Sequence, residues 1–237
     1  MRTRTKYSEK IKRMTIIGLF VALAYAVSAV LPIKVSFLTL DFKDVISTIC
    51  GMFFGPVTGI ACAIIVPFME FITTSETGVY GLIMNLLSSV SFVAISTLVY
   101  KNRKTIGGAI LGLGTALSTT LAVMLLANLF ITPYYMGVTQ EAVIALIPKL
   151  IFPFNLIKLI LNSGLIMLIY KPVSRVLKKM GLSKSVVSTN VSKSDDKAKN
   201  RTRSLIVTLA STVIVILAII VVFNVLGGEF QFGWTKA

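Results

Sequence analysis

Long apolar stretches, separated by short polar or basic segments, dominate the chain. A helix needs about 20 mainly apolar residues to cross a bilayer. The pattern predicts spans near residues 14–32, 43–55, 57–73, 79–100, 106–131, 148–171 and 204–226. The second span is short and Gly55-Pro56 follows it, so we expect it to be tilted, partly re-entrant or shielded by neighbours. The predicted fold class is an all-α integral membrane protein with a six-helix core and one additional C-terminal transmembrane helix.

Composition divides the chain into three parts. Residues 1–180 hold the six-helix core, residues 181–203 form a polar cytoplasmic linker predicted to be flexible, and residues 204–237 hold the extra span and a short outer tail. The extra span carries no charged residue from Leu205 to Leu226, so we expect anchoring or lateral packing. No inverted repeat is visible, which weakens the case for a secondary transporter of that type.

The distribution of charge predicts the orientation. The chain is 55% hydrophobic and 14% charged, with a formal net charge of +15. Most Lys and Arg residues lie in the N-terminal arm, in the loop at 101–104 and in the segment 171–203. Under the positive-inside rule these segments are cytoplasmic, which places the protein in the cell membrane as a multi-pass protein with its C-terminus extracellular. The same asymmetry explains the basic charge without nucleic acid as a partner.

Several chemistries have little support in the sequence. The chain has no histidine, and the few acids outside termini and loops make a catalytic set hard to assemble. No P-loop motif is present, and the glycines from Gly107 to Gly114 favour close helix packing over nucleotide binding. Cys50 and Cys62 lie in apolar segments and are interpreted as packing residues. We expect no enzymatic activity, no metal and no resident cofactor.

A polar stripe in the sixth span is the strongest functional signal. Asn155, Lys158 and Asn162 share one face of an otherwise apolar helix because they are spaced i, i+3 and i+7. A cation and amides inside a membrane helix usually mark a site that faces a cavity or a partner. Alternatively, Lys158 snorkels outward and the amides satisfy interhelical hydrogen bonds.

Other polar residues are expected at the same depth. Asn85 and Asn128 lie near the outer ends of the fourth and fifth spans. The apolar first loop, residues 32–40, either rests on the outer helix ends or covers a ligand. Apolar surface would come from Phe37, Leu38, Leu40 and Tyr80. A mostly apolar pocket with a few fixed polar groups suits a flat amphipathic molecule.

Three acids have more than one interpretation. Asp41 and Asp44 precede or open the second span, where a carboxylate favours a helix N-terminus. A contribution to a ligand site is the alternative, and acid–base catalysis is a remote one. Glu70 lies near the outer end of the third span, where it is either interfacial or part of a site or ion pair.

A stripe of small residues marks the first helix. Gly18, Ala22 and Ala26 recur every four residues, which permits a close approach of another helix. The stripe either packs internally or faces a partner membrane subunit.

These features together resemble the substrate-binding S components of energy-coupling factor (ECF) vitamin transporters, most of all the riboflavin-specific members. The resemblance covers about residues 10–180. It is carried by Ala22-x-x-x-Ala26, Leu40-Asp41-Phe42-Lys43-Asp44-Val45, Gly51-x-x-Phe54-Gly55-Pro56-x-x-Gly59, Gly78-x-x-Gly81-x-x-x-Asn85 and Pro153-Phe154-Asn155-Leu156-Ile157-Lys158.

The resemblance implies a function and a set of roles. S components capture a vitamin from outside, pair with a membrane coupling subunit and two ATPase subunits, and deliver the vitamin inward by toppling. Carried over by position, Asn128, Asn155, Lys158 and Asn162 would hold the ribityl chain of riboflavin. Leu38, Leu40, Gly78 and Asn85 would surround its ring, and Gly18, Ala22 and Ala26 would meet the coupling subunit.

The sequence leaves alternatives open. The same architecture would also suit folate, thiamin or pantothenate, because Lys34, Lys43, Lys149 and Lys158 are available to an anionic vitamin. A stand-alone secondary transporter would show ion-dependent uptake without ATPases. A membrane enzyme acting on lipid or peptide has the least support.

Overall fold

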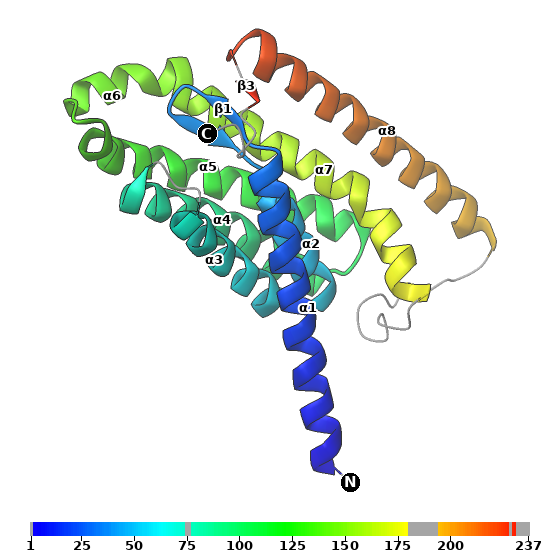
Figure 1. The fold of residues 1–237 in the computed structure, drawn as a ribbon. Coiled ribbons are helices and arrows are strands. Elements are labelled where there is room, and N and C mark those ends of the chain that lie inside the picture. Colours follow the sequence, from blue (N-terminus) through cyan, green and yellow to red (C-terminus); the bar gives the residue numbers. More distant parts are fainter. Residues whose placement is uncertain (1, 74–76, 180–193, 228, 231–237) are drawn as a thin grey trace.

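The computed structural model describes residues 2–73, 77–179, 194–227 and 229–230, and these form a helical bundle with a small sheet at one end (Figure 1). A short helix and a π-helical turn lead directly into the last core helix. The helical elements are α1 (Arg2–Val30), α2 (Lys43–Phe54), α3 (Pro56–Thr73), α4 (Gly78–Asn102), α5 (Ile106–Met136), α6 (Gln140–Leu146), η1 (Ile147–Ile151), α7 (Phe152–Lys179) and α8 (Ser194–Asn224).

The predicted spans correspond to these helices, but α6 and η1 were not predicted, and they extend the sixth span to Gln140–Leu177. Within the described residues, the helices long and apolar enough to cross a membrane are Pro56–Thr73, Gly78–Asn102, Ile106–Met136, Gln140–Leu177 and Ile206–Asn224. In α1 the apolar part is shorter, Met14–Val30. The 12 residues of α2 extend about 18 Å, less than the hydrocarbon thickness of about 30 Å. Since nearly all of α2 is buried, it is shielded by neighbouring helices.

The first loop is a β-hairpin, which the sequence pattern does not indicate. Strands β1 (Ile33–Val35) and β2 (Leu38–Leu40) pair antiparallel, and Ser36 takes a positive φ of 56° in the turn between them. A third strand, β3 (Glu229–Phe230), follows α8 and pairs antiparallel with β1. The strand order β2-β1-β3 therefore attaches the C-terminal part of the chain to the hairpin.

Helix α8 packs along α7 (Figure 1), in line with the lateral packing expected from its uncharged part, which begins at Leu205. A Cβ atom added to Gly164 of α7 would lie 2.8 Å from Cγ2 of Val215, so this glycine permits the close approach of α8. The buried face of α8 carries Ser211, Val215, Ala218 and Val222 at helical spacing. Of the predicted linker, residues 181–193 lie outside the described residues, whereas residues 194–203 belong to α8.

Two further expectations concern packing. A Cβ atom on Gly112 of α5 would lie 2.6 Å from the carbonyl oxygen of Ser96 in α4, which confirms that this glycine serves close helix contact. Cys50 and Cys62 are buried in one apolar cluster with Val21 and Val66, with their sulfur atoms 3.8 Å apart. Their interpretation as packing residues is confirmed.

Candidate ligand-binding site

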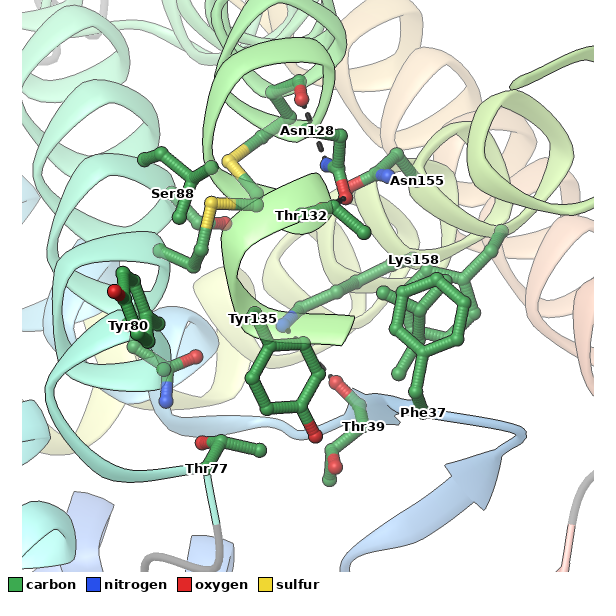
Figure 2. A pocket seen from close by; sticks show the side chains of 17 residues that line it. Phe37, Thr39, Thr77, Tyr80, Ser88, Asn128, Thr132, Tyr135, Asn155 and Lys158 are labelled. Atoms are coloured by element: carbon green, nitrogen blue, oxygen red, sulfur yellow. Dashed lines mark hydrogen bonds between the residues drawn. The ribbon is translucent and has the colours of Figure 1, made fainter. Parts of the chain in front are cut away.

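A cavity opens at the end of the bundle that carries the hairpin (Figure 2). The space between its walls, including the open mouth, is about 700 Å³. The lining comes from the hairpin, the first turns of α4, the last turns of α5 and the first turns of α7. The lining residues are Phe37, Leu38, Thr39, Thr77, Tyr80, Gly81, Met84, Asn85, Ser88, Met124, Asn128, Ile131, Thr132, Tyr135, Phe154, Asn155 and Lys158.

One wall of the cavity is polar and comes from α5 and α7. Asn128 donates through Nδ2 to the carbonyl of Met124 at 2.7 Å and accepts at Oδ1 from the hydroxyl of Thr132 at 3.0 Å (Figure 2). Asn155 donates through Nδ2 to the carbonyl of Ile151 at 2.8 Å. These bonds fix both amides but use only part of their capacity, because an amide has two N–H donors and two acceptor lone pairs. Both side chains can therefore also bind a ligand.

Lys158 reaches into the cavity and does not snorkel outward. Its ammonium donates to Oδ2 of Asp41 at 3.0 Å and to the carbonyl of Thr39 at 3.4 Å, and the residue is 6% exposed. Figure 2 shows its amine directed toward Thr39 of the hairpin. Since an ammonium has three donors, one N–H remains for a ligand. The snorkelling interpretation is wrong because a buried carboxylate holds the charge inside.

Asp41 also belongs to a longer buried network. Its Oδ2 accepts from Lys43 Nζ at 3.1 Å, and Lys43 donates to Oε2 of Glu70 at 2.7 Å. Oε1 of Glu70 accepts a hydrogen bond from the hydroxyl of Ser28 in α1. The chain of contacts joins α1, α3, the start of α2 and α7, and ends at Lys158 on the cavity wall. All five residues are buried.

This network decides between the interpretations of the three acids. Asp41 serves as a counter-ion, and no side chain caps the N-terminus of α2, which corrects the capping interpretation of Asp41. Asp44 lies within the first turn of α2 and is buried, but neither of its carboxylate oxygens has a hydrogen-bond partner among the described residues. Glu70 is buried in an ion pair, so the interfacial interpretation is wrong.

Five of the eight predicted ligand residues come together in the cavity lining: Leu38, Asn85, Asn128, Asn155 and Lys158. The other three lie outside it. Leu40 is fully buried in the apolar cluster beneath the hairpin. Gly78 is exposed at the start of α4, between Thr77 and the lining residues that follow it. Asn162 lies one turn beyond Lys158, is fully buried, and has an amide without a hydrogen-bond partner among the described residues.

Several lining residues were missed, although helical spacing could have found some of them. Met124, Thr132 and Tyr135 lie four before, four after and seven after Asn128, so they share its face of α5. Ser88 follows Asn85 by three residues. Thr39 and Thr77 have no such signal because they lie in a hairpin strand and a loop. Phe37 and Tyr80, expected as apolar surface, do line the cavity.

The small-residue stripe of α1 faces away from the bundle. Gly18, Ala22 and Ala26 are all exposed, whereas Ala24 and Ser28 on the opposite face are buried. Internal packing by this stripe is therefore excluded. A close-packing surface remains open on the outside of α1.

Comparisons with known proteins lead to one family of transporters. A family model described as "ECF transporter, substrate-specific component" matches residues 12–170. Riboflavin transporter RibU of Staphylococcus aureus (strain TCH60) is 31% identical over 178 residues, which are 71% of this chain and 94% of the relative. Riboflavin transporter FmnP of Bacillus subtilis (strain 168) is 26% identical over 174 residues, covering 68% and 91%.

A solved structure shows a similar fold. It is described as the S component of a bacterial ECF transporter and matches with a TM-score of 0.62 at 29% identity. The match covers 71% of this chain and 99% of the other. A segment of this chain therefore has no counterpart in that structure.

Proposed function

Since this chain belongs to the family of ECF transporter substrate-specific components, we propose that it captures riboflavin at the outer face of the cell membrane. It then delivers the vitamin inward as the substrate-binding subunit of an ATP-driven transporter. The two riboflavin transporters among its relatives support this ligand. The observation that carries the proposal is a cavity with one apolar side and one wall of amides, a hydroxyl and an ammonium.

The two sides of the cavity suit the two parts of riboflavin. Phe37, Leu38 and Tyr80 offer apolar and aromatic surface for the flat ring system, with Asn85 available to its polar edge. Asn128, Asn155 and Lys158 offer fixed donors and acceptors for the hydroxyls of the ribityl chain. Leu40, Gly78 and Asn162 act only indirectly in this arrangement, through the packing behind the lining.

Orientation follows from the positions of the basic segments. The cavity is lined by the beginnings of α4 and α7 and the end of α5. The N-terminal arm, the α4–α5 loop and the end of α7 consequently lie at the opposite end of the bundle. These segments hold most of the basic residues, so we place them in the cytoplasm and the cavity outside. The C-terminus is then extracellular.

Partners and chemistry complete the proposal. The exposed stripe of Gly18, Ala22 and Ala26 meets a membrane coupling subunit, which works with two ATPase subunits. The protein itself catalyses no reaction and holds riboflavin only as cargo. Within the described residues, no group of three or more His, Cys, Asp or Glu side chains is placed to hold a metal ion.

The absorption spectrum of the full chain, purified in detergent from cells grown in rich medium, is the direct test. A flavin spectrum with quenched fluorescence supports riboflavin capture. Protein that is colourless and also fails to quench added riboflavin contradicts it. Substitution of both Asn155 and Lys158 by Ala is expected to weaken riboflavin binding strongly, and unchanged affinity would refute the assigned site.

A further inference from the structure

We propose that Asp41 is a specificity-determining residue: as the counter-ion of Lys158, it makes the cavity select uncharged riboflavin over its phosphate ester. This inference rests on the proposed function. It concerns a residue that does not line the cavity and acts through one that does.

The ion pairs leave no uncompensated cation at the cavity wall. Asp41 Oδ2 lies 3.0 Å from the ammonium of Lys158 and 3.1 Å from that of Lys43. Lys43 is compensated a second time by Glu70 at 2.7 Å. The formal charges of these two lysines and two acids cancel. The neighbouring acid Asp44 can only add negative charge to this balance.

Burial makes this compensation effective. Asp41 is 4% exposed and Lys43 2% exposed, so water and salt screen the pairs little. Charges removed from water need a matched partner, because an unpaired buried ion is strongly unfavourable. The side chain of Lys158 thus presents a donor to the cavity while its net charge is already matched.

This arrangement treats the two flavins differently. A phosphate monoester carries a charge of about −1.5 to −2 at pH 7 and needs cations to replace its water. Lys158 is the one cation among the cavity-lining residues, all of which lie in the described part of the chain. A ribityl hydroxyl needs only donors and acceptors, which Asn128, Asn155 and Thr132 supply. The wall therefore favours a polyol end over a phosphate end.

The test compares two ligands on matched variants of the full chain. Dissociation constants for riboflavin and riboflavin 5′-phosphate are measured by quenching of flavin fluorescence in detergent. We expect the wild type to prefer riboflavin. In Asp41→Asn the ammonium of Lys158 loses its counter-ion and can pair with the phosphate. The ratio of the two dissociation constants is then expected to fall by roughly tenfold or more, the size of one charge-assisted hydrogen bond. Tighter binding of the phosphate ester should account for most of the change.

Two further variants separate electrostatics from loss of structure. Glu70→Gln removes the same unit of charge one ion pair further away, and it should leave the ratio of the two affinities near its wild-type value. Adding Lys158→Met to Asp41→Asn should abolish the gain for the phosphate ester. A purely structural role of Asp41 would weaken both ligands equally.

Three outcomes overturn the inference. The first is an Asp41→Asn protein that still binds riboflavin but has the wild-type ratio of the two dissociation constants. The second is a Glu70→Gln protein in which this ratio changes as much as in Asp41→Asn. A wild-type protein that prefers the phosphate ester also overturns it, even if Asp41→Asn fails to fold. In contrast, a wild-type protein that binds neither flavin contradicts the proposed function itself.

Discussion

Ending the chain at Gly227 removes β3 and should speed the release of bound riboflavin. The hairpin carries Phe37, Leu38 and Thr39, which line the cavity, so we expect a hairpin that moves more easily to release the ligand faster. Strand β3 pairs with β1 at Ile33–Phe230 and Lys34–Glu229 and holds the hairpin from its outer edge. A chain that ends at Phe230 keeps this pairing and is the matched control.

The pairing sets the size of the effect. Two residue pairs correspond to about two backbone hydrogen bonds, each contributing about 0.5–1.5 kcal/mol net. Losing them makes hairpin opening easier by about 1–3 kcal/mol, which is roughly 5- to 150-fold in the dissociation rate.

Dilution of the riboflavin-loaded protein, with recovery of flavin fluorescence followed over time, measures that rate. Equal rates for the chains ending at Gly227 and Phe230 would refute the role of β3. A faster rate in both chains would instead assign the effect to the residues beyond Phe230. Thermal melting of both proteins shows whether the bundle itself is intact.

Four further predictions concern substitutions of individual residues or residue pairs. Tyr100→Phe or Tyr170→Phe alone should lower the free energy of unfolding in detergent by about 1–3 kcal/mol, because the two buried hydroxyls hydrogen-bond at 2.7 Å. The double variant should lose less than the sum of the two single losses, and strict additivity would contradict this pairing. Gly164→Leu in α7 should lower the melting temperature because its side chain pushes Val215, and with it α8, away from α7. Gly114→Leu, with nothing within 4 Å of its added Cβ, should not lower it, and equal melting of the two variants would show that α8 does not need the close contact. The double substitution Ala22→Leu and Ala26→Leu should leave riboflavin binding by the isolated protein intact. In cells that supply the coupling subunit and ATPases, it should abolish riboflavin uptake. Normal uptake would exclude this face of α1 as the interface. Asn162→Leu should leave riboflavin affinity unchanged. It should also leave the free energy of unfolding equal or raise it by up to about 1–3 kcal/mol, because it removes a buried amide without a partner among the described residues. A clear loss of affinity would show that Asn162 contacts the ligand.

The long helices were predictable because their apolar runs stand out from composition alone, whereas α6 and η1 are short and lead directly into α7. The polar stripe was also readable, since Asn155 and Lys158 are conspicuous in an apolar helix and the structure places both on the cavity wall. Asn162 obeys the same periodicity but lies one turn too deep to reach the cavity lining. Helical spacing specifies a face, whereas depth depends on the neighbouring helices.

Long-range pairing is what the sequence concealed. Nothing in the local pattern links Asp41 to Lys158, which is 117 residues away, or Glu70 to Lys43. Strand β3 is two residues long and pairs with a strand near the other end of the chain, so no periodicity marks it. The correct interpretation of the three acids required the tertiary fold, because a carboxylate near a helix start fits both a cap and a counter-ion.

The buried ion-pair network also affects the stability of the chain while it is being synthesised. Asp41, Lys43 and Glu70 leave the ribosome long before Lys158, so this network of ion pairs carries one unmatched negative charge until α7 is made. The arrival of α7 at once neutralises that charge and completes the cavity wall. Nascent chains that stop before Lys158 are therefore expected to be unstable in the membrane and open to quality-control proteolysis, and pulse-labelling of chains truncated before and after α7 measures this. The ion-pair network would then become neutral, and the protein able to bind its ligand, at the same step of synthesis.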